Sequence, residues 1–210
     1  KMTIPLLAKN KIVGVLCCQI ETGYQLNEQQ RELLSSLGRQ LGMAVENIRL
    51  YEEARALSLH DPLTGLANRR YLDISYASQV ARSKRHAQPF SLMLLDIDHF
   101  KLYNDNHGHG QGDRILIQVA DILRDSIRST DLAVRYGGEE FLLLISDSNA
   151  DAAFELAERF RLQIAGEIGV TISIGIADYR VNDILDEQIV RADTALYKAK
   201  HAGRNRAEVE

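Results

Sequence analysis

The sequence predicts an α+β fold, with a central, mainly antiparallel sheet and flanking helices that lie on one side of it. Three observations lead to this class. From about Phe90 onward, apolar runs of strand length and amphipathic helical segments follow one another in the order β-α-α-β-β-α-β-α. Two of these strands are joined by a tight hairpin that contains glycines, which is typical of antiparallel neighbours. A hydrophobic content of 45% in 210 residues is enough for a proper core.

The N-terminal part predicts a β-hairpin followed by one long helix. Two apolar runs near the N-terminus are separated by Lys9-Asn10-Lys11, which is a hairpin pattern. From Asn27, an N-cap with Gln30 three residues later, to about Leu59 the pattern is helical. We therefore expect a hairpin part at 1–26, a linker helix at 27–60 and a larger domain at 61–210.

Apolar residues recur every seven positions in this helix, in two series offset by three. Such an a/d pattern predicts pairing with a twin helix in a homodimer. In the alternative interpretation, the same stripe packs against the core of a sensor domain. The two series are Leu34, Leu41 and Ile48, and Leu37, Ala44 and Tyr51.

The elements of the larger domain follow from local signals. Asp61 stops the long helix, because Pro62 disfavours helical geometry in the residue before it, and Asn68 can cap a helix that runs to about Arg85. An apolar strand spans Phe90 to Asp98. The later pattern predicts a glycine-rich loop at 106–113, helices at about 112–127, 149–164 and 185–202, and a strand at 170–177.

Two clusters of acids stand at the ends of predicted strands. Asp96 and Asp98 are two residues apart, so they lie on the same strand face, as a metal site requires; Asp98 could instead cap the next helix. In the turn of the hairpin, Gly137 and Gly138 let a ligand approach the main chain, and the two glutamates after them attract a hard cation. That combination suits a triphosphate with its magnesium, although a solvated hairpin with acids at its tip has the same pattern.

Three weaker signals have ordinary explanations as well. His107 and His109 could suggest a zinc site, but no third nitrogen or sulfur ligand is near in the sequence. The stretch Arg128-Ser129-Thr130-Asp131 is usually a surface ion pair. Lys200 lies near the end of the last helix, where the helix dipole alone favours a cation.

The charge balance and the cysteines limit the partners and the location that we expect for the chain. The chain has 25 basic and 29 acidic residues, so it lacks the electrostatic footprint of nucleic-acid binding, and we expect no nucleic-acid partner. The neighbouring Cys17 and Cys18 point to opposite faces of a strand, which disfavours a disulfide and suggests a reducing, cytoplasmic location. No stretch is apolar enough to span a bilayer and no signal peptide is present, so we expect no membrane contact by this segment. A longer native protein could still be membrane-attached through other parts.

These motifs together resemble the GGDEF family, the diguanylate cyclases, over most of the chain. The hairpin turn matches the family signature in its Gly-Gly-Glu-Glu-Phe form, with Glu139 in place of the aspartate. Four further motifs have matching spacing. They are Asp61 to Arg70, Asp96 to Lys101 with Asn104 and Asp113, Arg128 to Asp131, and Ala199 to Asn205. Residues 1–26 and the helix after them resemble the closing strands and last helix of a GAF domain, a small-molecule sensor module.

The resemblance implies a fold like the palm of polymerases and nucleotidyl cyclases, with a ferredoxin-like core. It implies an enzyme that condenses two GTP molecules into cyclic di-GMP and two pyrophosphates across the interface of a homodimer. Two divalent ions, Mg²⁺ or Mn²⁺, are expected per active site. The implied metal ligands are Asp96, the carbonyl of Ile97 and Glu139, and the implied catalytic residues are Asp96, Glu139 and Glu140. The general base is not assigned.

The resemblance also implies two sets of nucleotide contacts. GTP would meet the guanine-reading pair Asn104 and Asp113 together with Phe100, Lys101, Gly137, Gly138, Lys200 and Arg204. Cyclic di-GMP would bind as an inhibitor at Arg128 and Asp131, with Arg159 as the first candidate and Arg161 as the second for a completing arginine. Asp113 argues against a mixed guanine and adenine product. The alternative function is a catalytically silent cyclic di-GMP receptor that signals through the linker helix.

Overall fold

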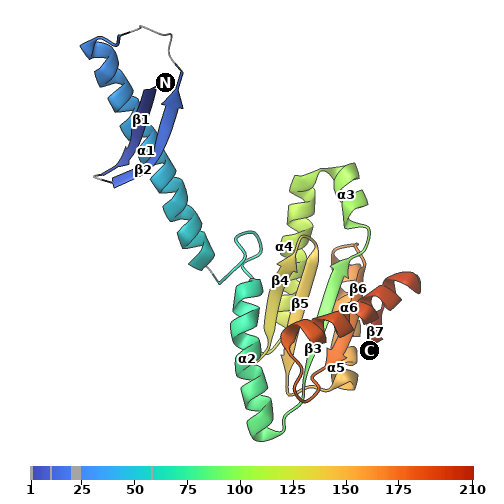
Figure 1. Cartoon of the computed structure of the whole chain (residues 1–210). Coiled ribbons are helices and arrows are strands. Elements are labelled where there is room, and N and C mark those ends of the chain that lie inside the picture. The colour runs from blue at the N-terminus through green and yellow to red at the C-terminus, as the bar shows by residue number, and fades with distance from the viewer. Residues whose placement is uncertain (1, 10, 20–24, 58) are drawn as a thin grey trace. The chain divides into compact units, whose positions relative to one another are not determined.

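The computed structural model describes residues 2–9, 11–19, 25–57 and 59–210 (Figure 1). The chain divides into two compact units, residues 1–58 and residues 59–210. The predicted three-part division stays a prediction. Within the described residues, no helix combines the length and the apolar character that a membrane crossing requires.

The first unit is a hairpin packed on a long helix. Strands β1 (Met2–Ala8) and β2 (Lys11–Cys18) pair antiparallel, and helix α1 spans Glu28–Leu57. The predicted N-cap is confirmed: Asn27 Oδ1 accepts a hydrogen bond from the Gln30 amide at 2.8 Å, and Gln30 Oε1 accepts one from the Asn27 amide at 3.1 Å. Of the predicted turn, residue 10 lies outside the described residues.

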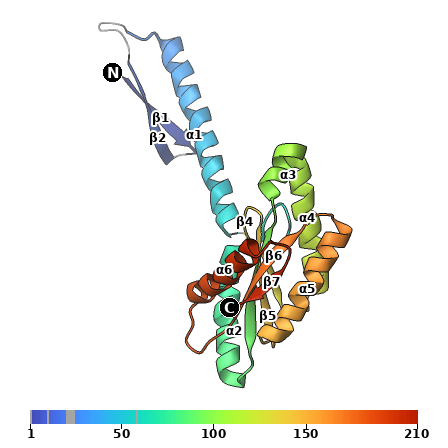
Figure 2. The ribbon, with the colours of Figure 1, turned by 90° about the vertical axis from the view of Figure 1, so that its right-hand side faces the viewer.

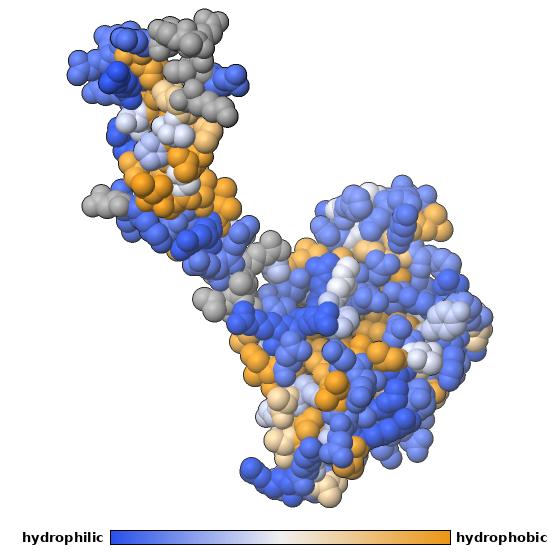
Figure 3. All heavy atoms as spheres, in the orientation of Figure 1, coloured by the Kyte–Doolittle hydropathy of each residue, from blue (hydrophilic) through white to orange (hydrophobic). Residues whose placement is uncertain are grey.

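Strand β1 meets α1 at two glycines. A β-carbon at Gly38 would lie 2.6 Å from the Pro5 carbonyl oxygen, and one at Gly42 would lie 2.4 Å from the Leu7 backbone. The hairpin therefore packs against the glycine side of the helix. The predicted heptad seam stays largely exposed within this unit, with Ile48 60% and Tyr51 70% exposed, and hydrophobic residues are visible on the surface of the unit in Figure 3.

The second unit is built on a five-stranded sheet in the order β4-β5-β3-β6-β7. All neighbours are antiparallel except β6 and β7. The predicted strands are confirmed, and β7, a three-residue strand, is an addition. The strands are β3 (Phe90–Ile97), β4 (Leu132–Gly137), β5 (Glu140–Ser146), β6 (Ile172–Asp178) and β7 (Ala207–Val209).

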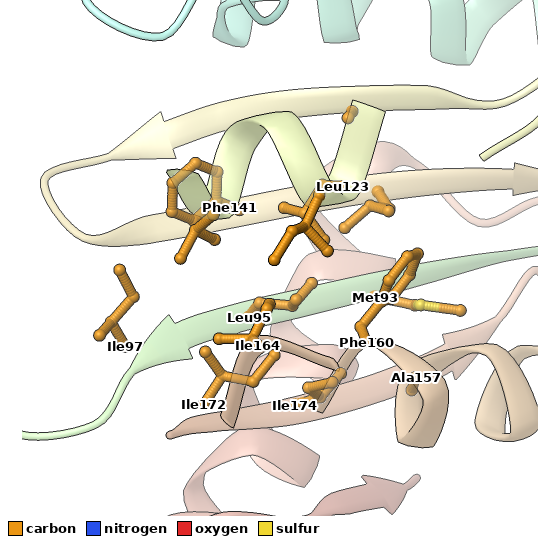
Figure 4. Close-up of a cluster of buried hydrophobic side chains, with 14 of the residues drawn as sticks. Met93, Leu95, Ile97, Leu123, Phe141, Ala157, Phe160, Ile164, Ile172 and Ile174 are labelled. Atoms are coloured by element: carbon orange, nitrogen blue, oxygen red, sulfur yellow. The ribbon is translucent and has the colours of Figure 1, made fainter. Parts of the chain in front are cut away.

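Helices cover both faces of this sheet, so the prediction of helices on one side is wrong (Figure 2). The reason lies in β3, whose eight residues are all buried. Its alternate side chains belong to two separate cores, one against α4 and α5 (Figure 4) and the other against α2 and α6. The helices are α2 (Arg69–His86), α3 (Phe100–His107), α4 (His109–Ser126), α5 (Ala150–Glu167) and α6 (Leu185–His201).

The predicted glycine-rich loop at 106–113 is also wrong. Gly108, with φ 82°, is the break between α3 and α4, and α4 begins at His109. Asp113 therefore lies in a helix and not in a loop. Asn68 caps α2 as predicted, since its side chain accepts from the Tyr71 amide at 3.1 Å.

Candidate active site

The acids of the two predicted clusters meet at one edge of the sheet. Asp96, near the end of β3, pairs directly across the sheet with Glu140, the first residue of β5. The two side chains therefore lie on the same face. Asp96 shares its strand face with Leu92 and Leu94, so it points to the side covered by α6.

The turn between β4 and β5 is fixed by backbone contacts. Gly137 pairs with Glu140, and Gly138 has φ 22°. The carbonyl of Glu139 accepts a hydrogen bond from the Ile97 amide at 3.4 Å. Glu139 is thereby held beside the end of β3 through its main chain, and no hydrogen bond of its carboxylate is found in the described part of the chain.

The carboxylates at this edge have raised proton affinity. Burial raises the pKa of Asp96, which is 8% exposed, while the hydrogen bond and charge of Lys200 work in the opposite direction. Burial, followed by the charge of Asp96, raises the pKa of Glu140. The Lys200 ammonium lies 2.9 Å from Asp96 Oδ2. One cation thus compensates part of the negative charge that the acids gather here.

This donor set suits a divalent cation. Carboxylate and carbonyl oxygens are the ligands that Mg²⁺ and Mn²⁺ prefer, and burial, followed for Glu140 by the charge of Asp96, raises the pKa of these carboxyl groups. Among the described residues, no group of three or more His, Cys, Asp or Glu side chains is arranged to hold a metal by itself. A metal here would therefore need oxygens from a ligand such as a phosphate to complete its coordination.

Asn104 and Asp113 lie on adjacent helices. The Asn104 Oδ1 atom is buried and has no hydrogen-bond partner among the described residues, whereas Asp113 is exposed on the first turns of α4. A β-carbon at Gly112 would lie 1.9 Å from Asn104 Oδ1 and 3.2 Å from the Phe100 ring. The absence of a side chain at Gly112 therefore leaves room for the Asn104 amide and the Phe100 ring.

The basic residues of the predicted GTP set come from three elements. Lys101 is exposed on α3, Lys200 contacts Asp96 from α6, and Arg204 is exposed in the turn that follows α6. Burial raises the pKa of Asp96, and the charge of Arg204 works against that rise, so the guanidinium belongs to the same electrostatic environment.

The alternative role of Asp98 as a helix cap is wrong. The N-cap of α3 is His99, which makes no side-chain capping bond. Asp98 instead accepts hydrogen bonds from Thr171 and Ser173 of the β6 region and from the Asn205 amide. His107 contacts Tyr103, through a ring stack and a hydrogen bond to its carbonyl, which gives the zinc alternative no support.

Arg135 links the glycine turn to Asp61, a contact that the sequence did not indicate. Arg135 donates to the Gly138 carbonyl at 2.9 Å through Nη2, and its Nη1 lies 3.2 Å from Asp61 Oδ1. Asp61 also accepts from the Thr64 amide and hydroxyl, both at 2.8 Å. The loop that opens this unit is thus tied to the glycine turn. Only the close match of Asp61 to Arg70 to a family motif hinted at such a role.

We expect Asp61→Asn to lower the free energy of unfolding by about 2 kcal/mol at neutral pH. Burial alone would raise the pKa of Asp61, but the hydrogen bonds from Thr64 and Arg135 and the charge of Arg135 hold it below its ordinary value of 3.8. A depressed pKa contributes stability above the unfolded value, and this contribution is lost as the pH falls through the folded value. The difference from the parent protein should therefore begin to shrink near pH 4 and continue to shrink as the pH falls further.

Urea unfolding at pH 7 and pH 3 measures this difference. Asp73→Asn, which changes an exposed acid on α2, serves as the control and should change stability little at either pH. A loss for Asp61→Asn that is the same at both pH values would contradict the assignment of charge to this contact.

The stretch Arg128 to Asp131, hereafter the RxxD motif, borders a cavity of about 580 Å³. Arg128, Asp131 and Arg159 line it, and Arg161 does not, because Arg161 binds Glu158 and Asn205. Asp131 accepts hydrogen bonds from the Arg128 and Ser146 amides. Its carboxylate therefore shapes the cavity, while Arg128 and Arg159 bring positive charge to it.

Comparisons with known proteins match the two parts of the chain separately. The family model described as "Diguanylate cyclase, GGDEF domain" matches residues 58–206, and the GAF domain model matches residues 1–45. Diguanylate cyclase A of Treponema denticola is 34% identical over 97% of this chain and 57% of its own length. Diguanylate cyclase DgcM of Escherichia coli K12 is 42% identical over 77% of this chain and 40% of its own length. The chain thus spans only about half of such curated relatives.

Solved structures show the same similarity. The GGDEF domain of DgcB from Caulobacter crescentus, in complex with c-di-GMP, has a TM-score of 0.68 and 31% identity, covering 72% of this chain and 92% of that one. The active GGEEF domain of a diguanylate cyclase from Vibrio cholerae has a TM-score of 0.64 and 36% identity, covering 69% of this chain and 97% of that one.

Proposed function

Because the chain belongs to the GGDEF family, whose model matches residues 58–206, we propose that it is a diguanylate cyclase that condenses two GTP molecules into cyclic di-GMP and two pyrophosphates. The observation that carries the proposal is the direct pairing of Asp96 with Glu140 beside the Gly137–Glu140 turn, with Lys200 against the same carboxylate. The carboxylates that would bind metal and the ammonium that would bind phosphate lie together there, as phosphoryl transfer requires.

Each residue of the site has a role in this reaction. Asp96, Glu139 and the Ile97 carbonyl would hold two Mg²⁺ or Mn²⁺ ions, which would polarise the α-phosphate and help to deprotonate the attacking 3′ hydroxyl. Lys101, Lys200 and Arg204 stabilise the charge that develops on the leaving pyrophosphate. Asn104 and Asp113 bind the guanine edge, for which the unpartnered Asn104 Oδ1 offers an acceptor. Glu140, which pairs with Asp96 across the sheet, would lie beside the second metal or the attacking hydroxyl.

The reaction needs two copies of the chain, because each protomer presents one GTP to the other. The exposed seam of α1, with Leu41, Ile48 and Tyr51, suits the pairing of two helices. Dilution below the dimerisation constant should then reduce the activity per protomer. The location in the cytoplasm, where GTP is made, is part of the same proposal.

Incubation with GTP and Mg²⁺, followed by chromatography with mass detection, tests the function. We expect a cyclic dinucleotide and two pyrophosphates per pair of GTP molecules, and none when EDTA removes the metal. Cyclic di-GMP binding without turnover would instead favour the silent receptor. Equal turnover of GTP alone and of mixed GTP and ATP would contradict guanine selection by Asp113.

Product inhibition at the RxxD cavity gives a second expected result. Arg128→Ala should leave the initial rate of synthesis unchanged and raise the inhibitory concentration of cyclic di-GMP by about tenfold or more, because a charged contact to phosphate is lost. Initial rates over a series of cyclic di-GMP concentrations measure the shift.

Arg85→Ala, which removes an exposed arginine at the end of α2, is the control and should leave inhibition unchanged. Asp131→Ala is less suitable, because it also removes the acceptor for the Arg128 and Ser146 amides. Unaltered inhibition in Arg128→Ala would remove the regulatory role from this cavity.

A further inference from the structure

The turn after α6 has an unusual backbone. Gly203, Arg204 and Asn205 have φ values of 112°, 61° and 47°, so three successive residues lie in the left-handed region. Asparagine tolerates this conformation, but for Arg204 it is costly and needs support from outside the turn. Arg204 itself is exposed, and its guanidinium makes no hydrogen bond or ion pair within the described residues.

Asp98 supplies one support. Its Oδ2 atom accepts from the Asn205 amide at 3.1 Å and from the Thr171 hydroxyl at 2.7 Å, and its Oδ1 atom accepts from the Ser173 hydroxyl at 2.7 Å. The residue is 7% exposed. A buried carboxylate with all of these donors is rigid, and it joins the end of β3 and the β6 region to the turn.

Helix α5 supplies the other support. Arg161 donates to the Asn205 side chain at 3.2 Å and is held by Glu158 at 2.7 to 3.0 Å. The hydrogen bond from Arg161 lowers the pKa of Glu158, so the pair stays charged at neutral pH. Glu158 also accepts from the Ala207 amide at 3.3 Å, just beyond the turn.

A buried carboxylate is often no more than a satisfied core group. Asp98 differs because it contacts Asn205, more than a hundred residues away in the sequence. It thereby stabilises a strained turn that carries the Arg204 side chain. The Thr171 and Ser173 hydroxyls bind one carboxylate oxygen each, and the bond to the Asn205 amide adds a contact with a third segment.

We propose that Asp98 is a positioning residue for the reaction: it holds the Gly203–Asn205 turn so that Arg204 faces the triphosphate. The inference rests on the proposed function and names a residue that acts through Arg204, not on the substrate. The Arg161–Glu158 pair assists from the other side of the turn.

Asp98→Ala tests this, because it removes the carboxylate that accepts all three bonds. Asp98→Asn would be unsuitable: its oxygen could still accept from the Asn205 amide while its NH₂ group donates to the Ser173 hydroxyl. We expect kcat/KM for GTP to fall by up to about 100-fold, as expected for a misplaced catalytic contact. Thr171→Val, which removes a donor to Oδ2 but leaves the Asn205 amide in place, is the matched control and should cost much less.

A double variant with Arg204→Ala distinguishes a positioning role of Asp98 from a purely structural one. If Asp98 acts through Arg204, the double variant Asp98→Ala/Arg204→Ala should be within about twofold of Arg204→Ala alone. Hydrogen exchange at the Asn205 amide should accelerate in Asp98→Ala and stay slow in Thr171→Val. Binding of cyclic di-GMP at the RxxD cavity reports that the fold is intact.

Additive effects of the two substitutions, or a protected Asn205 amide in Asp98→Ala, would overturn the inference. If Asp98→Ala does not fold, Arg161→Met removes the second support, leaves Asp98 intact and should show the same dependence on Arg204. If the parent protein makes no dinucleotide, the proposed function fails, and the role of Asp98 is then decided by Asn205 exchange and by the affinity for a fluorescent GTP analogue in EDTA.

Discussion

Glu139→Ala should reduce the synthesis of cyclic di-GMP by about a thousandfold, because it removes a carboxylate ligand of the proposed metal pair. The fold should survive. The contact of residue 139 with β3 uses its carbonyl and the Ile97 amide, which the substitution leaves in place. Initial rates of pyrophosphate release with GTP and Mg²⁺ measure the loss, and circular dichroism checks the fold.

Asp73→Ala, on an exposed face of α2, is the matched loss of one carboxylate and should keep full activity. Cyclic di-GMP should bind Glu139→Ala with the affinity of the parent protein, because the RxxD cavity does not contain Glu139. A variant that keeps more than about a tenth of the activity would show that Glu139 is not a metal ligand.

Gly175→Ala should destabilise the second unit by about 3 kcal/mol, which corresponds to a fall in Tm of roughly 6 to 12 °C. A β-carbon at Gly175 would lie 2.0 Å from the Ala192 carbonyl oxygen and 2.3 Å from the Leu196 amide nitrogen. Both are backbone atoms of α6, so the whole helix must shift away from β6. Thermal unfolding followed by circular dichroism measures the effect.

Gly166→Ala is the matched control. Its β-carbon would meet no heavy atom within 4 Å, and the residue lies in α5, so stability should rise by about 0.5 kcal/mol. Since α6 also presents Lys200 to Asp96, the Gly175 variant should lose activity below its melting temperature as well. An unchanged Tm would mean that α6 packs less closely on β6 than the structure has it.

The sequence predicts the elements of this fold because their signals are local. The strand before Asp96, the turn at Gly137 and the caps at Asn27 and Asn68 depend on residues that are close together in the chain. The face of the sheet that each helix covers is not set by nearby residues, and the prediction that all helices cover one face was wrong. The uninterrupted apolar run of β3 was itself the sign of a strand buried on both faces.

The site shows the same division. Composition identifies the strand end at Asp96 and the hairpin tip at Gly137, but only the resemblance to the GGDEF family implied that their acids act together. The contacts of Asp98 with Asn205 and of Arg135 with Asp61 join distant segments, and no local pattern indicates them. The Gly108 break was misjudged because a single glycine is enough to separate two helices where a longer loop was expected.

If cyclic di-GMP inhibits the enzyme at the RxxD cavity as proposed, helix α5 limits which substitutions can relieve that inhibition. Arg159 faces the RxxD cavity, while Glu158, which also lines it, and Arg161 hold the segment after α6. A genetic screen for strains that overproduce the dinucleotide should therefore recover changes at Arg128 far more often than at Glu158, because the first affects inhibition alone and the second weakens catalysis as well.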